Sequence, residues 1–250
     1  MKELAGNWFR ADQKETASTM LDLLLPELQS RKEEFVLVTA DFQTAGRGQH
    51  GTAWEAERGK NLLFGFSLHP GFLKAGEQFR LSEILALAIA AALDGYTDGG
   101  FCIKWPNDIY FGNRKICGML LEHDLHGNRI ATTRAGIGIN VNQRAFRSGA
   151  PNPVALYEIL GYETDRETLL LRILDEFEKR YRRLQTDKYA PETEYLQRLY
   201  RREGVFPYRD AAGRFLARIA GVEPTGRLLL EDDKGSLRRY AFKEVVFELC

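Results

Sequence analysis

The segment KICGMLLEHDLHGNRIATTRAGIGINVN (Lys115–Asn142) combines two long β-type runs with a short turn. Apolar and β-branched residues recur through 116–125 and 129–141, and the turn residues 126–128 (His-Gly-Asn) separate them. This pattern predicts a hairpin of two long antiparallel strands. Because a hairpin differs from the strand–helix–strand repeat of a doubly wound sheet, the sequence favours an α+β fold.

The residues before this hairpin switch between helix-like and strand-like patterns. Apolar spacing of three and four residues predicts helices over 15–28, where Pro26 interrupts the pattern, and over 78–96. Short apolar and β-branched runs predict strands over 35–40, 61–69, 101–105 and 109–111. We therefore expect a mixed sheet with helices packed against it.

The residues after the hairpin change from helical to β-type. We expect helices over 166–189 and 191–202, and short strands separated by turns after Gly204. Five strands in about 45 residues predict a small barrel. The expected architecture is a mixed β-sheet domain flanked by helices at 1–203, followed by a small C-terminal β-barrel at 204–250.

The composition excludes several classes of protein. The 250 residues include 35 Lys+Arg and 35 Asp+Glu, so the net charge is zero and the basic surplus of a dedicated nucleic-acid binder is absent. The longest apolar run, Ile84–Leu93, is too short to span a membrane, and the N-terminal residues resemble no signal peptide. The three cysteines, Cys102, Cys117 and Cys250, suit neither a disulfide framework nor a zinc site. We expect a cytoplasmic protein.

The sharpest local motif is the glycine-rich loop QTAGRGQHGTAW (Gln43–Trp54). Closely spaced glycines allow the backbone to approach a ligand, and consecutive N–H groups can bind an anion. Arg47 adds a planar guanidinium suited to phosphate or carboxylate. The loop matches neither the P-loop nor the dinucleotide-binding pattern. An ordinary surface loop is the competing interpretation.

Three further motifs lie in the strands. KWPND (Lys104–Asp108) joins a cation, an aromatic ring, an amide and a carboxylate at a proline turn, although a polar turn is the simpler interpretation. In KICGM, strict alternation predicts that Lys115, Cys117 and Met119 share one face of their strand, and Gly118 marks a close approach. The glycines of GIGINVN (Gly136–Asn142) suit either a flat ligand or a close strand crossing.

The order and spacing of these motifs resemble those of biotin–protein ligases. GRGQHGTAW is similar to the family's GRGRxGRxW loop, and KWPNDIY, KICGMLLE and GIGINVN follow in the family's order. Thr16–Met20 (TASTM) resembles the family's Ser-Thr-Asn helix opening, and Phe242–Val245 (FKEV) its closing strand. The resemblance covers essentially the whole chain and implies a biotin/lipoyl ligase-like catalytic domain with an SH3-like barrel. Because only about fifteen residues precede the Ser-Thr motif, we expect the ligase-only class without an N-terminal DNA-binding domain.

The resemblance implies a two-step reaction. Biotin and ATP form biotinyl-5′-AMP, and biotin then passes to a specific lysine of a carboxylase carrier domain. Lys115 matches the catalytic lysine, and Arg47 lies in the loop that closes over the intermediate. The resemblance also implies Mg²⁺, with Asp108 as a candidate contact, and a homodimer as one expected state. No nucleic acid or membrane partner is expected.

The remaining site residues follow from matching motif positions. The residues expected to bind biotin are Ser18, Thr19, Gln43, Gly46, Arg47, Gly48, Gln49, Lys115 and Gly118. Those expected to bind ATP or AMP are Arg47, Trp54, Lys104, Asn107 and Asn140. The chain departs from the family pattern at Gln49 and Thr52, where arginines are frequent, and at Met20, where asparagine is frequent.

Two alternatives stay open at this point. A lipoate- or octanoyl-transferring relative shares the expected core fold, although Gln43 with Ser18 and Thr19 suits a polar ureido ring better than a purely apolar acyl chain. A non-catalytic biotin or nucleotide sensor is the second alternative, and the presence of both Arg47 and Lys115 argues against it.

Overall fold

The computed structural model describes residues 7–46, 48, 53–147, 152–186 and 189–248. Its larger sheet has the strand order β1-β2-β3-β7-β6-β5-β4. These strands are β1 (Trp8–Gln13), β2 (Phe35–Ala40), β3 (Leu62–Leu68), β4 (Phe101–Lys104), β5 (Asp108–Phe111), β6 (Arg114–His126) and β7 (Arg129–Ile139). Only β1 and β2 pair in parallel, so the sheet is mixed and the predicted long hairpin, β6–β7, is confirmed.

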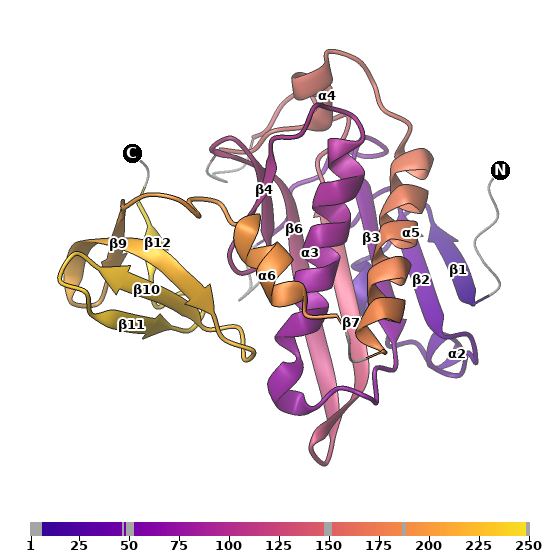
Figure 1. Cartoon of the computed structure of the whole chain (residues 1–250). Helices are drawn as coiled ribbons and strands as arrows, with labels where there is room; N and C mark the ends of the chain where they lie inside the picture. Colours follow the sequence, from indigo (N-terminus) through magenta and orange to yellow (C-terminus); the bar gives the residue numbers. More distant parts are fainter. Residues whose placement is uncertain (1–6, 47, 49–52, 148–151, 187–188, 249–250) are drawn as a thin grey trace.

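Two long helices cover one face of this sheet (Figure 1). They are α3 (Phe79–Asp94) and α5 (Arg166–Leu184), and their apolar faces meet a row of aromatic rings on β2 and β3. Phe66 packs against Phe177 with ring centroids 4.8 Å apart, and Phe35 meets Tyr181 at 5.4 Å. The main core therefore lies between the sheet and these helices, and the predicted helix over 78–96 is present as α3.

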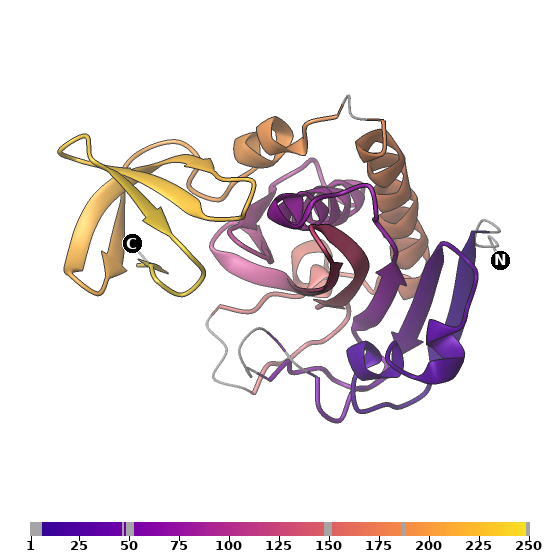
Figure 2. The ribbon, with the colours of Figure 1, turned by 90° about the horizontal axis from the view of Figure 1, so that it is seen from below.

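The opposite face carries only short helices, α1 (Thr19–Asp22) and α2 (Pro26–Gln29), as Figure 2 shows. The helical pattern over 15–28 is interrupted at Pro26, as predicted, but the helix begins only at Thr19 and α1 is shorter than expected. Leu25 adopts an extended ψ of 135° immediately before Pro26, because a proline disfavours the helical region for the residue that precedes it. The shorter helices leave much of this face uncovered.

The strand β1 was not predicted. Its polar residues obscure the alternation, but Trp8 stacks on Phe35 with ring centroids 4.4 Å apart. The predicted helix over 166–189 ends at Leu184, and the one over 191–202 becomes α6 (Pro191–Gln197). The residues after α6 instead cover the edge of the sheet, since Ile103 N donates to Arg198 O and Tyr200 N donates to Ile103 O.

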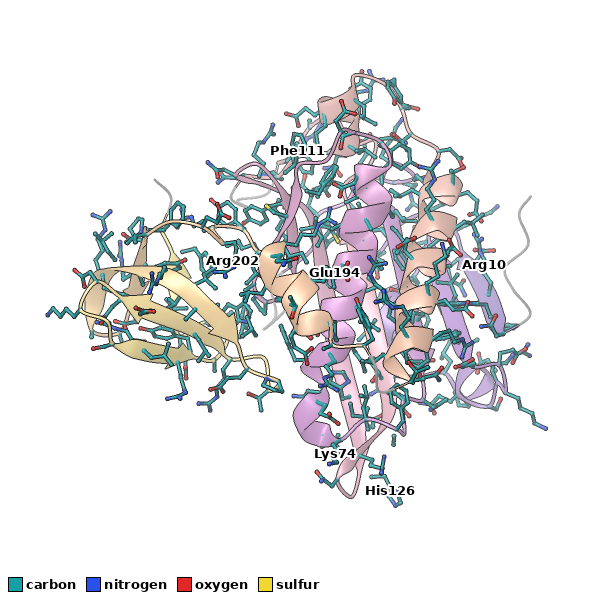
Figure 3. All side chains as sticks on the ribbon, viewed as in Figure 1. Arg10, Lys74, Phe111, His126, Glu194 and Arg202 are labelled. Carbon is teal, nitrogen blue, oxygen red and sulfur yellow. The ribbon has the colours of Figure 1, made fainter. Side chains whose placement is uncertain are left out.

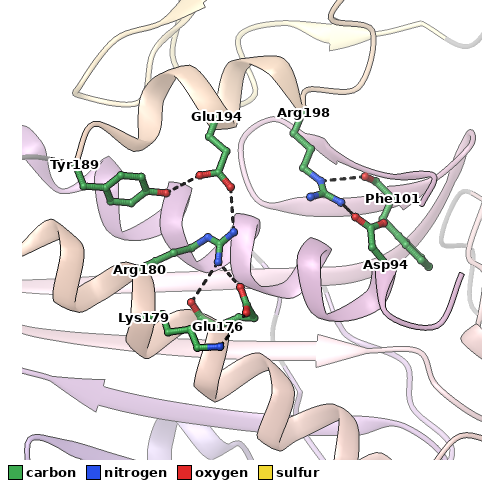
Figure 4. Close-up of polar contacts among 8 residues, drawn as sticks. All are labelled: Asp94, Phe101, Glu176, Lys179, Arg180, Tyr189, Glu194 and Arg198. Atoms are coloured by element: carbon green, nitrogen blue, oxygen red, sulfur yellow. Dashed lines mark hydrogen bonds and ion pairs between the residues drawn. The ribbon is translucent and has the colours of Figure 1, made fainter. Parts of the chain in front are cut away.

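Ion pairs tie α6 to the other helices, as the close-up in Figure 4 shows. Glu194 accepts hydrogen bonds from Arg180 at 3.0 Å and from the Tyr189 hydroxyl at 2.8 Å. Arg198 pairs with Asp94 at the end of α3. These contacts hold the connection to the C-terminal sheet against α3 and α5. The short elements α4 (Leu156–Leu160) and η2 (Ala75–Glu77) complete the described helices.

The C-terminal sheet has five antiparallel strands, as predicted, and resembles an SH3-like barrel. They are β8 (Phe206–Asp210), β9 (Gly213–Val222), β10 (Leu228–Asp232), β11 (Leu237–Tyr240) and β12 (Val246–Phe247), in the order β11-β10-β9-β8-β12. Tyr208, Ile219 and Leu230 fill its centre. Trp105 Nε1 donates to Gly226 O at 2.8 Å, and Arg202, labelled in Figure 3 between the two sheets, donates to Ile219 O at 3.1 Å.

Two further properties of the described residues concern membrane-spanning helices and cysteines. None of their helices is both long and apolar enough to cross a membrane. Cys102 and Cys117 are free thiols, and Cys250 lies outside the described residues. Burial raises the pKa of both thiols, so neither is a ready nucleophile.

Glu83 is a buried carboxyl on α3 that faces α6. Its side chain is 1% exposed, and its Oε2 atom has no hydrogen-bond partner among the described residues. Burial is the main cause that raises the pKa of Glu83 to about 8. The nearby Glu192 carboxylate adds to this increase, and Arg80 reduces it in part. The folded state therefore holds Glu83 protonated near neutral pH.

This arrangement predicts a loss of stability as the pH rises. Between the ordinary value of 4.5 and about 8, the folded chain binds a proton at Glu83 that the unfolded chain has released, so the free energy of unfolding falls with increasing pH. Glu83→Gln is expected to raise the free energy of unfolding at about pH 9 by a few kcal/mol, on the order of the pKa shift. Urea unfolding across this pH range measures it, with the exposed Glu203→Gln as control. Equal stabilisation of both variants contradicts the assignment.

Candidate functional site

A cavity of about 880 Å³ opens on the face of the sheet opposite α3 and α5, beside the C-terminal barrel. Most of the predicted site residues that the structure describes line it: Ser18, Thr19, Gln43, Gly48, Trp54, Lys104, Asn107, Asp108, Lys115, Gly118 and Asn140. Gly46 lies just behind the lining, where its carbonyl accepts a hydrogen bond from Trp54 N at 3.0 Å. Arg47 and Gln49 lie outside the described residues, as does Thr52.

At the floor of the cavity, three glycines on β6 and β7 let side chains of the lining lie directly on the strand backbone. Gly118 on β6 pairs with Gly138 on β7, and Gly136 lies two residues away on the same face. A Cβ atom at position 138 would lie 2.5 Å from Trp54 Cε2, and one at position 136 would lie 2.7 Å from Met20 Cγ. These positions require glycine because other side chains already lie directly against the backbone.

A β-bulge turns Lys115 toward this floor. In the β5–β6 pair, Ile109 lies opposite Cys117 whereas Tyr110 lies opposite Lys115, so Ile116 is the extra residue. The prediction that Lys115 shares a face with Cys117 and Met119 is therefore wrong, because one inserted residue reverses the alternation. Lys115 instead points to the side of Gly118, where its Nζ would lie 3.2 Å from an added Cβ.

The two lysines of the cavity have different partners. Lys115 Nζ pairs with Asp108 Oδ1 at 2.6 Å and lies 5.6 Å from the centroid of the Trp54 ring. Lys104 Nζ donates to the Tyr110 hydroxyl at 3.1 Å. Burial lowers the pKa of Lys104, although the nearby Asp108 carboxylate raises it in part. Two ammonium groups therefore line the same cavity from β4 and β6, the strands on either side of β5.

One end of the cavity presents small polar groups at the start of α1. Gln43 Oε1 accepts hydrogen bonds from Thr19 N at 2.8 Å and from the Thr19 hydroxyl at 3.3 Å. Ser18 caps the helix by accepting from Met20 N at 3.3 Å. Ser18 and Thr19 are each 2% exposed, so these hydrogen-bonding groups are held rigidly beside the cavity. They suit a small polar ring.

The other end contains unsatisfied polar atoms. Asn140 Nδ2 donates to Val154 O at 3.2 Å, whereas Asn140 Oδ1 is buried and has no partner among the described residues. The same holds for the indole nitrogen of Trp54. Since a buried polar atom without a partner is costly, these two atoms mark positions where a ligand can supply a hydrogen bond. Asn107 differs, because its side-chain amide donates to Met119 O and so braces β6.

The barrel contributes a wall of the cavity. Phe242, Lys243, Val245, Val246 and Phe247 line it, and Lys104 Nζ lies 5.5 Å from the centroid of the Phe247 ring. The resemblance implied a closing strand at Phe242–Val245, but these residues form the turn before β12. None of the five was among the predicted site residues, because their place in the cavity depends on how the barrel packs against the larger sheet.

No metal cluster is present within the described ranges. No group of three or more His, Cys, Asp or Glu residues there is arranged to hold a metal ion. Asp108, the predicted Mg²⁺ contact, is already paired with Lys115. A resident metal site therefore does not fit the described residues.

Comparison with known proteins identifies the family. The model of the Biotin/lipoate A/B protein ligase family matches residues 12–142, more than half of the chain. The chain belongs to this family. The match contains the glycine-rich loop, the strands of the cavity floor, and both Lys104 and Lys115.

Individual proteins similar to this chain are consistent with the family assignment. The chain is 30% identical over 218 residues to the Bifunctional ligase/repressor BirA of Bacillus subtilis, covering 83% of this chain and 65% of that protein. It is 29% identical over 204 residues to the Biotin–[acetyl-CoA-carboxylase] ligase of Paracoccus denitrificans, covering 79% and 85%. The biotin protein ligase of Aquifex aeolicus in complex with biotin and ATP superposes with a TM-score of 0.77 and 26% identity, over 95% and 97% of the two chains.

The contact between Trp54 and the glycine floor can be tested directly. Gly138→Ala is expected to push the indole off the strand, shift the Trp54 fluorescence to longer wavelength and destabilise the fold by about 1–3 kcal/mol through overpacking. Emission spectra and thermal unfolding measure both effects. Gly71→Ala, where an added Cβ meets nothing within 4 Å, is the matched control.

The emission change has to come from Trp54, since Trp8 and Trp105 also fluoresce. In a Trp54→Phe background, Gly138→Ala is therefore expected to leave the emission unchanged. A spectral shift that persists without Trp54, or no shift with it, would falsify the contact.

Proposed function

We propose that this chain is an ATP-dependent biotin–protein ligase. The observation that carries the proposal is the position of Lys115. The bulge turns its ammonium toward the glycine positions at the floor of the cavity. There it lies between the polar groups at Gln43 and the unsatisfied amide oxygen of Asn140. The relatives support it, since two are described as biotin ligases and the Aquifex protein binds biotin and ATP. The chain spans 65% of the length of the BirA relatives, so its activity is inferred from the site.

The first step joins two anions. A carboxylate oxygen of biotin attacks the α-phosphorus of ATP, the bond from that phosphorus to the bridging oxygen breaks, and pyrophosphate leaves with the electron pair. The product is the mixed anhydride biotinyl-5′-AMP. Lys115 Nζ reduces the repulsion between carboxylate and phosphate, and Asp108 orients the ammonium. Arg47 is the second cation assigned to this step.

The two substrates are assigned to opposite ends of the cavity. The ureido ring of biotin takes the polar end, with Ser18, Thr19 and Gln43 as hydrogen-bonding groups. The remaining members of the biotin subsite are Gly46, Arg47, Gly48, Gln49, Lys115 and Gly118. Adenine takes the other end, where the free Asn140 oxygen can accept from its amino group. Trp54, Lys104 and Asn107 flank the nucleotide in this proposal.

The second step transfers biotin to protein. The neutral ε-amine of a carrier lysine attacks the carboxyl carbon of the mixed anhydride, the bond to the AMP oxygen breaks, and an amide forms as the nitrogen loses a proton. The carrier is a carboxylase carrier domain, as the names of two relatives suggest. In this proposal residues 1–203 carry the chemistry, and residues 204–250 form the adjoining barrel.

Magnesium enters this proposal only as the ion bound to ATP. Mg²⁺ retains waters and binds through substrate phosphates with one or two carboxylates, so it does not need a protein cage. Asp108 is the carboxylate nearest to Lys115 and is the candidate contact. Asp108 can contact the Mg²⁺ of ATP only if its carboxylate interacts with the metal and with Lys115 together.

The proposal predicts that Lys115→Ala abolishes adenylation. Removing the ammonium leaves the carboxylate–phosphate repulsion uncompensated, so we expect biotin-dependent exchange of labelled pyrophosphate into ATP to fall by about 10²–10³-fold, the usual effect of losing one charge-stabilising group. Lys179→Ala, an exposed lysine on α5 on the other side of the sheet, is the control. Circular dichroism verifies that both variants fold.

Two outcomes argue against this function. Exchange that continues at the wild-type rate in Lys115→Ala removes Lys115 from the reaction. Wild-type exchange that depends on lipoate or octanoate, but not on biotin, assigns the chain to the acyl-transferring branch of the family.

A further inference from the structure

The turn between β11 and β12 carries a lysine in an unusual conformation. Lys243 has a φ of +68°, in the left-handed region that residues other than glycine and asparagine rarely adopt. The turn itself is well defined, since Glu244 N donates to Ala241 O at 3.2 Å and Glu244 Oε2 accepts from Ala241 N at 2.7 Å. The sequence therefore retains a lysine where glycine would fit the backbone better.

The turn is fixed against the ligand cavity. Phe242 meets Trp105 edge to face with ring centroids 6.3 Å apart, and Trp105 also donates to Gly226 O at 2.8 Å. Phe242 and Lys243 both line the 880 Å³ cavity. The Lys243 side chain is exposed and forms no ion pair with any described residue; its nearest recorded partner is the Phe242 ring, 6.0 Å from Nζ.

The charges of the described lining favour an anionic ligand. The lining holds three lysines, Lys104, Lys115 and Lys243, and two acids, Glu55 and Asp108. Lys115 is paired with Asp108, and Lys104 donates to the Tyr110 hydroxyl. Lys243 differs from both, because its ammonium has no hydrogen-bonding or ion-pair partner among the described residues.

We propose that Lys243 binds the β- and γ-phosphates of ATP, which leave as pyrophosphate. The proposal rests on the proposed function for the identity of the nucleotide, and it adds a residue from the barrel to the site. Lys115 is assigned to the α-phosphate, and Lys243 lines the same cavity with its ammonium unpaired among the described residues, so it is available to the terminal phosphates. An ammonium there offsets the charge that accumulates on the departing pyrophosphate.

The position inside the cavity favours a nucleotide over a protein ligand. A lysine that recognised an acidic surface of the carrier would be expected on the outside of the barrel, like Lys234 in the turn between β10 and β11, which lines neither recorded cavity. Lys243 instead lines the cavity, four residues before Phe247, whose ring lies 5.5 Å from Lys104 Nζ.

The test compares ATP with AMP, which lacks the terminal phosphates. Binding of each nucleotide is measured by calorimetry for the wild type, Lys243→Asn, Lys243→Arg and Lys234→Asn. Asparagine suits the left-handed backbone, so Lys243→Asn removes the charge without straining the turn. We expect Lys243→Asn to weaken ATP binding about tenfold, as expected for one charge-assisted contact, and to leave AMP binding unchanged. Lys243→Arg retains ATP binding, and Lys234→Asn has no effect.

Several results would overturn the proposal. ATP binding that is unchanged in Lys243→Asn removes Lys243 from the site, and equal losses for ATP and AMP reveal a merely structural turn. Unchanged ATP binding combined with slower transfer to a carrier domain assigns Lys243 to the carrier. Biotin-dependent exchange in the wild type separates the two ideas: if ATP binds through Lys243 but no exchange occurs, the proposed function fails while this inference stands.

Discussion

The lining of the cavity depends on three glycines of two neighbouring strands, which let side chains from elsewhere in the chain lie directly on the strand backbone. Gly118 and Gly138 pair across β6 and β7, and the Trp54 ring lies against them at distances that leave no room for a Cβ atom. At Gly136 the Met20 side chain occupies the equivalent space. The opposite face of the same strands is filled by the core under α3 and α5, so the sheet is packed on one side and open on the other. This asymmetry creates room for a ligand without weakening the main core.

The electrostatics of the site follow from where a few charges lie. The chain as a whole has no net charge, yet three lysines converge on one cavity from β4, from β6 and from the turn before β12. Two acids accompany them in the part of the lining that the structure describes, and Asp108 is paired with Lys115. Local focusing of charge is sufficient for binding a carboxylate and a polyphosphate, because interactions in a confined cavity are screened less than those on the surface.

Patterns of local spacing predicted much of this molecule. The hairpin 116–141, the buried helix at 78–96 and the five C-terminal strands each have a strong period or clear turn residues, and each is present. Eleven of the site residues that were predicted from the order of the motifs line one cavity. The errors have identifiable causes. A single bulge at Ile116 reversed the face assigned to Lys115, and the polar residues of β1 concealed a strand. The interruption of the first helical pattern at Pro26 was predicted, but not the late start of α1 at Thr19. The barrel wall at Lys243 depends on tertiary docking and has no local signal.

The proposed function requires that this site activates biotin and delivers it to a protein lysine. The most direct measurement is the intact mass of a purified, unmodified biotin carboxyl carrier domain after incubation with this protein, biotin, ATP and Mg²⁺. The proposed function predicts a mass increase of one biotinyl group on one lysine, and this increase requires both biotin and ATP. A carrier mass that stays unchanged, while the protein binds both substrates, would contradict it.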